Sequence, residues 1–222
     1  MNADDVHRQW AKRSGEFSPE YYVHRGPDRA SEAIRALVER SVGTDGSVLE
    51  LGCSSGRHLA RLHTAGFRDL AGIELNADAL TVMESTYPDL AASGRFHAAA
   101  IEDVVETVAD DAFDAVYSVE TLQHVHPESA WVFEELVRIA DTLLITVENE
   151  GTVTGRRGAG GGRNDDADGH RLNRDDARMT YVDEGVPLYY RDWGRVFTDL
   201  GCTEVKAQVR RRDTLRAFRP PE

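Results

Sequence analysis

The chain has 222 residues, of which 41% are hydrophobic, and carries a formal net charge of −13. This apolar content is enough for the packed core of one medium α/β domain or two small ones, which excludes disorder over most of the chain and a fibrous class. The negative charge would repel a phosphate backbone, so nucleic acid is not an expected partner.

The chain has no predicted membrane or export segment. No apolar run approaches the roughly 18 residues that a membrane helix needs. The start, Met1 to Asp5, lacks both the basic and the apolar part of a signal peptide. We therefore expect a cytoplasmic protein without a membrane partner.

Cysteine and lysine are both scarce. Cys53 and Cys202 lie far apart and form no CxxC pair, which argues against a disulfide framework and a cysteine zinc site. The histidines are scattered without acid–histidine spacing, so no metal site is expected. Only 2 lysines accompany 24 arginines. An acidic, lysine-poor chain is typical of salt-loving organisms, whereas a GC-rich genome that favours arginine codons explains the same bias equally well.

Apolar segments alternate between two periods, as in a βαβα chain with buried parallel strands. The predicted strands are 47–52, 70–75, 95–100, 113–119 and 142–148. The predicted helices are 28–41, 56–65, 76–86, 128–140 with Trp131 facing inward, and 188–200 with Tyr189 on its apolar face. Segments 203–209 and 214–219 are joined too closely for a parallel crossover, so they predict an antiparallel hairpin.

Two segments fall outside this pattern. Residues 1–27 carry several aromatic residues and are predicted to form a lid. Residues 149–187, rich in Gly, Arg and Asp in their first half, form a loop insertion that is either disordered or a cover over the active site. The later part, His170 to Pro187, contains apolar residues that could fold back. We expect residues 28–222 to form one domain.

The first predicted strand ends in a loop of small residues that opens a helix. Residues Val48 to His58 read VLELGCSSGRH. Small residues allow a ligand to approach the backbone, and the free N–H groups at a helix start favour an anionic or polar group. The loop lacks the G-x-G-x-x-G spacing of a dehydrogenase, because Ser54 stands between Gly52 and Gly56. A tight turn without a ligand would give the same pattern in this loop alone.

A second acid strengthens the case for a nucleotide-type site. Glu74 ends the next predicted strand, in AGIEL, and a carboxylate there can accept both hydroxyls of a ribose. Together with Glu50 and the glycine loop, it resembles the class I S-adenosylmethionine-dependent methyltransferases, whose first motif is E/D-x-G-x-G-x-G. The resemblance covers about residues 20 to 150 by motif and the C-terminal hairpin by topology.

That resemblance implies a Rossmann-like doubly wound α/β sheet of about seven strands, mostly parallel, with helices on both faces. It implies S-adenosyl-L-methionine as cofactor and S-adenosyl-L-homocysteine as product. The implied cofactor-binding residues are Glu50, Gly52, Cys53, Ser54, Gly56, Glu74, Leu75, Ile101, Glu102, Ser118, Tyr22 and Arg25.

Within this set, the loop would hold the methionine part and Glu74 the ribose. Ala100 stands where the family usually has an Asp that reads the adenine. Ile101 would then pack on the adenine face, and Glu102 or Asp103 would take over its amino group.

A further match lies at residues 113–125, which read FDAVYSVETLQHV. The segment is similar to the FDxVxxxxxLxHV stretch of small-molecule O- and N-methyltransferases. It would place Ser118 to Glu120 beside the methyl donor. His124 and His126 are the candidate catalytic residues, since a positioned histidine can take a proton from the acceptor. Either could instead be a structural histidine.

The resemblance implies an enzyme that transfers a methyl group to an O or N atom of a small molecule, as a monomer or homodimer. Two alternatives stay open: a methyltransferase acting on tRNA or protein, and an S-adenosylmethionine-binding protein without catalysis. In related enzymes a Tyr or Arg before the first helix contacts the cofactor carboxylate, which makes Tyr21, Tyr22 and Arg25 candidates.

Overall fold

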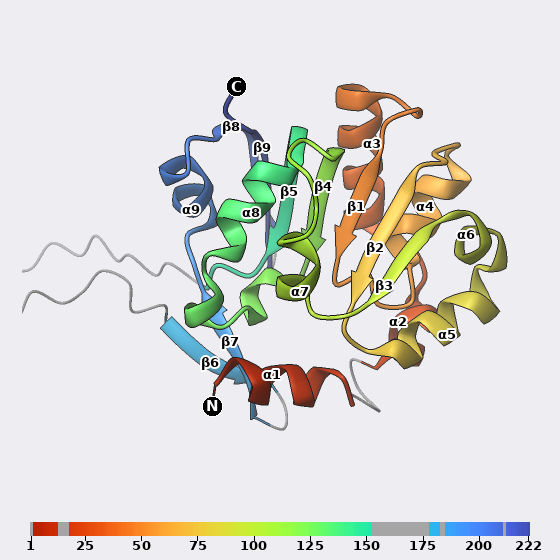
Figure 1. The fold of residues 1–222 in the computed structure, drawn as a ribbon, viewed down its shortest axis with the longest axis horizontal. Coiled ribbons are helices and arrows are strands. Elements are labelled where there is room, and N and C mark those ends of the chain that lie inside the picture. Colours follow the sequence, from red (N-terminus) through yellow and green to blue (C-terminus); the bar gives the residue numbers. More distant parts are fainter. Residues whose placement is uncertain (1, 13–17, 152–177, 183–184, 211) are drawn as a thin grey trace, which may run out of the picture.

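The chain folds around a seven-stranded sheet in the order β3-β2-β1-β4-β5-β9-β8 (Figure 1). The structure is a computed structural model that describes residues 2–12, 18–151, 178–182, 185–210 and 212–222. Neighbouring strands from β3 to β5 run parallel, whereas β9 runs antiparallel to both β5 and β8. The strands are β1 (Val48–Leu51), β2 (Leu70–Glu74), β3 (Arg95–Ala98), β4 (Phe113–Val119), β5 (Ala140–Glu148), β8 (Thr203–Val209) and β9 (Thr214–Arg219). The predicted doubly wound α/β sheet with a C-terminal antiparallel hairpin is confirmed.

Helices cover both faces of the sheet, and alternate strand residues face the two layers. Val48 and Tyr117 pack in one hydrophobic cluster, and their neighbours Leu49 and Val116 pack in the other. The first layer holds α3 (Arg29–Val42), α4 (Arg57–Thr64), α5 (Ala77–Thr86) and α6 (Pro88–Ser93). The second holds α7 (Ile101–Val105), α8 (Val132–Ile139) and α9 (Trp193–Asp199). Burial on both faces explains why the central parallel strands are mostly apolar, whereas the edge strand β3 is largely exposed.

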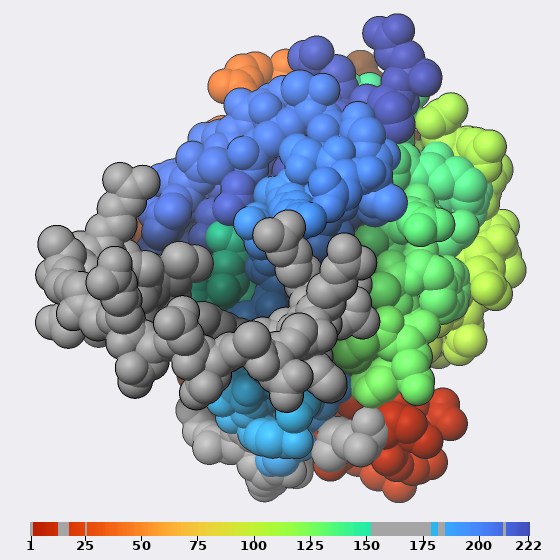
Figure 2. All heavy atoms as spheres, turned by 90° about the vertical axis from the view of Figure 1, so that its left-hand side faces the viewer, coloured from red at the N-terminus to blue at the C-terminus, as the bar shows by residue number. Residues whose placement is uncertain are grey.

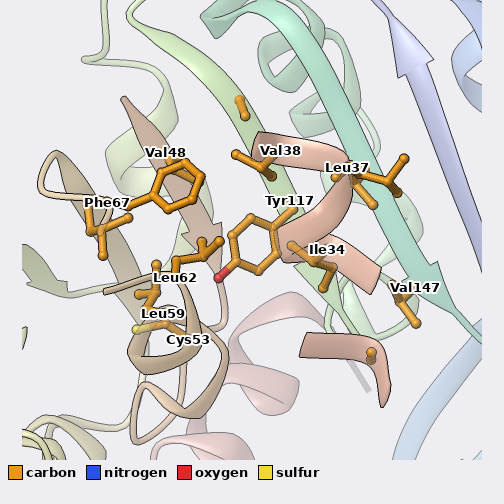
Figure 3. Packing of buried hydrophobic residues seen from close by; sticks show 14 of the residues in the cluster. Ile34, Leu37, Val38, Val48, Cys53, Leu59, Leu62, Phe67, Tyr117 and Val147 are labelled. Carbon is orange, nitrogen blue, oxygen red and sulfur yellow. The ribbon is translucent and has the colours of Figure 1, made fainter. Parts of the chain in front are cut away.

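Tyr117 lies at the centre of the first layer, between Ile34 of α3 and Leu62 of α4 (Figure 3). It is completely buried, and its hydroxyl donates a hydrogen bond to the Glu50 carboxyl at 3.0 Å. Burial raises the pKa of Glu50 well above its usual range. Burial therefore favours the neutral form of Glu50 inside the core.

Two helices and a two-stranded hairpin gather below the carboxyl ends of the parallel strands. Helix α1 (Ala3–Trp10) crosses this end of the molecule, α2 (Pro19–Arg25) packs near α5, and β6 (Arg178–Val182) pairs with β7 (Val186–Tyr190) in a separate hairpin (Figure 1). The side view shows α1 and the hairpin next to one another at the same end (Figure 2). None of the helices in the described ranges is both long and apolar enough to cross a membrane.

The predicted helix 188–200 is wrong over its first half. Residues Val186–Tyr190 form strand β7, so Tyr189 lies on a strand and not on a helical face. Helix α9 begins only at Trp193, because the carboxylate of Asp192 caps it by accepting the backbone N–H of Arg195 at 3.0 Å. The run VPLYY is rich in residues that favour strands and contains a proline that disfavours a helix interior.

The helix at 128–140 is also shorter than predicted. A 3₁₀ turn, Pro127–Ser129, comes first, and Ala140 already belongs to β5. Trp131 stands just before α8 and is 37% exposed, so its predicted inward position is wrong. Most of the insertion, residues 152–177, lies outside the described residues, which leaves its predicted role as cover or disordered loop untested.

We expect the stability of Glu50→Gln relative to the wild type to increase as the pH rises. An acid whose pKa is raised by folding stays protonated in the native state while the unfolded chain ionises, so its contribution to stability falls from about pH 4.5 upward. The glutamine amide oxygen can accept the same hydrogen bond from Tyr117, and the amide does not ionise in this pH range. Urea unfolding at about pH 5 and about pH 8 measures this effect. A difference between variant and wild type that does not change with pH would contradict a protonated Glu50.

Candidate functional site

A sharp turn connects β1 to α4 at the carboxyl edge of the sheet. Gly52, Ser54 and Gly56 have φ of 65°, 47° and 78°, in the left-handed region. A Cβ at Gly52 would overlap the side chain of Thr121 from the turn after β4. Glycine is thus required at position 52 both by the backbone angle and by the close approach of a second loop.

Glu74 ends β2 and holds this turn in place. Its Oε2 atom accepts the backbone N–H of Ser54 at 2.7 Å, and its Oε1 atom accepts the N–H of Asn76 at 2.8 Å. Burial raises the pKa of Glu74, while these donors favour the charged form. A carboxylate oxygen can accept more than one hydrogen bond, so Glu74 retains capacity for a ligand.

The turn and Glu74 line a cavity of about 1080 Å³, including its open mouth. Its floor comes from the ends of β1, β2 and β4, and its walls from α1, α2, α4 and the segment after β3. Most of its lining is apolar with a few polar groups, as is typical of small-molecule sites. The polar and charged residues in its wall include His7, Tyr22, Ser54, Arg57, His58, Glu74, Asn76, Glu102, Glu120, Thr121 and His124.

Helix α1 closes the cavity from outside the sheet. The ring of His7 lies 3.2 Å from the Glu102 carboxylate (Nε2 to Oε1), and this hydrogen bond raises the pKa of His7. Trp10 packs edge-on against His124, with ring centroids 4.7 Å apart. Val6 is buried at the cavity wall. Through these contacts α1 packs against the segments that follow β3 and β4, and together they form one wall of the cavity.

The turn after β4 is held by one buried carboxylate. Glu148, at the end of β5, is fully buried. It accepts the Ser118 hydroxyl at 2.6 Å and the backbone N–H groups of Thr121, Leu122 and Gln123 at 3.2, 3.1 and 3.3 Å. Burial raises its pKa to about 7, against the pull of these donors toward the charged form. Glu148 thereby fixes the segment that carries Glu120, Thr121 and His124.

His124 is a neutral imidazole in this turn. Its Nδ1 atom lies 3.0 Å from the carbonyl oxygen of Pro187 in β7 and therefore carries the hydrogen, which leaves Nε2 as an acceptor. Burial lowers the pKa of His124 to about 4. His124 can accept a hydrogen bond, but it is a weak proton acceptor near neutral pH.

Most of the predicted cofactor residues meet at this cavity. Those that line it are Tyr22, Gly52, Cys53, Ser54, Glu74, Leu75, Ile101 and Glu102, and the predicted catalytic residue His124 lines it too. Glu50, Gly56, Ser118 and His126 do not line it. Glu50 binds Tyr117 beneath the turn, Ser118 binds Glu148, and His126 lies 3.4 Å from Glu128. The side chain of Arg25 lies outside the described part of the chain.

Several lining residues, among them His7, Arg57 and Thr121, were not predicted from the sequence. The guanidinium carbon of Arg57 lies 5.2 Å from the ring centre of Tyr22. Arg57 directly follows the glycine turn, a position that could have been recognised as facing a ligand. In the described ranges, no group of three or more His, Cys, Asp or Glu side chains is arranged to hold a metal ion.

Residues 48–142 match the family model described as a methyltransferase domain. This match covers β1 to the start of β5, the part of the sheet that builds the cavity. Residues 48–142 are therefore similar to known methyltransferase domains.

Known methyltransferases resemble the chain at the levels of sequence and fold. A dTDP-3-amino-3,4,6-trideoxy-alpha-D-glucopyranose N,N-dimethyltransferase from Streptomyces venezuelae is 39% identical over 71 residues, which cover 31% of this chain and 30% of that protein. A sugar N-methyltransferase from Streptoalloteichus has a TM-score of 0.61 at 20% identity, with 95% of each chain covered. A geranyl diphosphate C-methyltransferase from Streptomyces coelicolor, in complex with Mg²⁺, geranyl diphosphate and S-adenosyl-L-homocysteine, has a TM-score of 0.66 at 12% identity, covering 99% of this chain and 98% of that one.

The aligned segment thus spans less than a third of the curated relative's length. The structural likenesses, at 20% identity or below, establish the shared fold of the methyltransferase domain.

Replacing Glu148 with Ala should strongly destabilise the protein. The change leaves the Ser118 hydroxyl and three backbone N–H groups without their buried acceptor, and each unsatisfied group costs about 1–3 kcal/mol. Glu148→Gln keeps an acceptor oxygen and should cost less. Urea unfolding of both variants measures the loss, with exposed Glu84→Gln as the control. Equal stability of Glu148→Ala and wild type would show that the turn is held by other contacts.

Proposed function

We propose that the protein transfers a methyl group from S-adenosyl-L-methionine to an N or O atom of a small molecule. The observation that carries this proposal is the cavity at the carboxyl ends of β1, β2 and β4, where a left-handed glycine turn faces the Glu74 carboxylate. The glycine turn and Glu74 lie within the segment that matches the methyltransferase model.

The residues present fit this cofactor. Glu74 offers a carboxylate for the two ribose hydroxyls, and the Gly52–Ser54 backbone lies beside it. Ile101 and Glu102 form the wall where the adenine would pack. Arg57 and Tyr22 lie together at another part of the wall and suit the methionine carboxylate. The bound cofactor would supply a methyl group carried on a sulfonium. The acceptor atom would attack this methyl group in line with the C–S bond, and the sulfur would leave.

The protein's own contribution to such a reaction is positioning and exclusion of water. Holding two reactants in line can lower a barrier by about 7–11 kcal/mol in favourable cases. Glu148 fixes the turn after β4, and α1 covers the cavity through Val6, His7 and Trp10. Both elements would hold the acceptor against the donor without taking part in bond changes.

A small acceptor is supported by the shape and the charge of the chain. The cavity is enclosed by α1, and the net charge of −13 disfavours a nucleic-acid strand. Two of the proteins described above are sugar N-methyltransferases by name, which favours a nitrogen acceptor on a small polar molecule. Residues 1–27 act as a lid in this proposal, and the domain comprises residues 28–222.

Glu74→Ala should weaken binding of S-adenosyl-L-homocysteine. The substitution removes charge-assisted hydrogen bonds worth about 1.5–3 kcal/mol each and frees the Ser54 turn. Calorimetry on the wild type, on Glu74→Ala and on exposed Glu106→Gln as a control measures the affinities. Unchanged affinity in Glu74→Ala would overturn the assignment of the ribose, and stronger binding of NAD than of S-adenosyl-L-homocysteine would overturn the cofactor.

Removing residues 1–12 should abolish turnover while the sheet stays folded. The deletion takes away Val6, His7 and Trp10 from the cavity wall and opens the site to water. Single-turnover transfer of a labelled methyl group to a metabolite extract, with tRNA and protein as comparison acceptors, measures the activity. Full-rate transfer by the truncated protein would show that α1 is not needed to close the site. Tight cofactor binding without transfer by the complete chain would favour a non-catalytic binding protein.

A further inference from the structure

A second hollow opens beside the cofactor cavity, at the carboxyl ends of β4 and β5. Arg57, Val119 and Glu120 line both spaces. The rest of the second wall comes from the start of α3, from β5 and from the turn between β8 and β9, through Asp28, Arg29, Ala30, Val147, Arg210 and Asp213. A molecule bound in the second hollow would therefore meet one bound in the first at Glu120.

Two carboxyl groups face each other where the hollows join. Glu120 follows β4 with a φ of 51°, and its backbone N–H donates to Val147 in β5 at 2.9 Å. Asp213, from the β8–β9 turn, lines the same hollow, and its carboxyl lies close enough to Glu120 for the two groups to interact electrostatically. No hydrogen-bond donor in the described part of the chain reaches the buried Oδ1 atom of Asp213.

Asp213 is the carboxyl here that can take up a proton near neutral pH. Burial, together with the charge of Glu120, raises the pKa of Asp213 to about 7, and Arg212 and Arg210 act in the opposite direction. His124 is much less suited to take a proton, because burial lowers its pKa to about 4. The ionisable groups that surround the pair are Tyr22 on α2, Asp28 and Arg29 at the start of α3, Arg57 on α4, and Arg210 and Arg212 in the β8–β9 turn.

We propose that the acceptor is an amine bound in the second hollow, and that the Glu120–Asp213 carboxyl pair takes the proton that this amine must lose. In this arrangement Glu120 touches the amine and Asp213 positions it and stores the proton. The inference rests on the proposed function, because it assigns the acceptor side of the same reaction.

The lone pair of the acceptor nitrogen forms the new N–C bond while the C–S bond breaks, and the electron pair of that bond stays on sulfur. The methylated nitrogen is left with one excess proton and a positive charge, and the carboxylate pair accepts that proton. Amines have pKa values of roughly 8–10, close enough to the pair for this exchange. An alcohol hydroxyl is a far weaker acid, so the same pair would be a poor base for O-methylation.

Sinefungin, the cofactor analogue that carries a primary amine at the position of the transferred methyl group, tests the assignment. Its affinity is compared with that of S-adenosyl-L-homocysteine by calorimetry in the full chain. In the wild type we expect sinefungin to bind on the order of tenfold more tightly, because its ammonium meets the carboxyl pair. This preference should grow as the pH rises through about 7, when the proton leaves Asp213.

The variants make the result specific. Glu120→Gln should lose the preference, and Asp213→Asn should keep part of it but lose the step near pH 7. Exposed Glu84→Gln is the control and should match the wild type. A preference unchanged in Glu120→Gln, with both ligands still bound, would overturn the inference and leave the proposed function standing. Failure of both ligands to bind the wild type would overturn the proposed function itself.

Carbon-13 NMR of labelled aspartate gives a readout that needs no turnover. The Asp213 carboxyl resonance should titrate near pH 7 in the wild type and at a lower pH in Glu120→Gln, where the neighbouring carboxylate is gone. A wild-type Asp213 that titrates below about pH 5 would overturn this role of Asp213.

Discussion

The buried carboxylate of Glu148 is the contact on which the reactive side of the molecule depends. A short turn after β4 has to bring Glu120, Thr121 and His124 to the edge of the sheet, and its backbone N–H groups point inward where no water reaches. Glu148 accepts three of them and the hydroxyl of Ser118. A single side chain from β5 thereby satisfies the turn and ties it to the neighbouring strand, so the ends of β4 and β5 move as one unit.

The same turn also limits the glycine loop. Thr121 occupies the space that a side chain at Gly52 would need, so the β1 and β4 ends pack directly against each other. Glu74 completes the arrangement from β2 by holding Ser54. Three adjacent parallel strands thus contribute one loop each, and the cavity is the space these loops share with α1. This geometry separates two sides of the site. The ends of β1 and β2 face the proposed cofactor, and the ends of β4 and β5 and the β8–β9 turn face the second hollow.

Local chemistry made much of this predictable from the sequence. The central strands are mostly apolar because both faces of the sheet are covered, and the segment VLELGCSSGRH ends a strand and begins a helix. These patterns placed the glycine loop and Glu74 correctly at one cavity. Glu50 and Ser118 were expected at the cofactor because their positions in the chain fit the motif. Both side chains point instead into the interior, where each is taken by a buried partner, Tyr117 or Glu148.

Long-range contacts could not be predicted in this way. The pairing of Glu120 with Asp213 joins two residues far apart in sequence, and the closure by α1 depends on His7 and Trp10 meeting Glu102 and His124. The strand at Val186–Tyr190 was mistaken for a helix because five residues of mixed aromatic and aliphatic character fit either period. Its true state is decided by its partner strand β6 and by the bond from His124 to Pro187.

We propose that the cavity binds S-adenosyl-L-homocysteine with its sulfur directed toward Glu120. A crystal structure of the protein with this ligand tests it most directly. The account predicts the ribose hydroxyls on the Glu74 carboxylate, the adenine beside Ile101 and Glu102, and the sulfur facing the junction of the two hollows. A ligand bound with its ribose away from Glu74, or with its sulfur turned away from Glu120, would contradict the account.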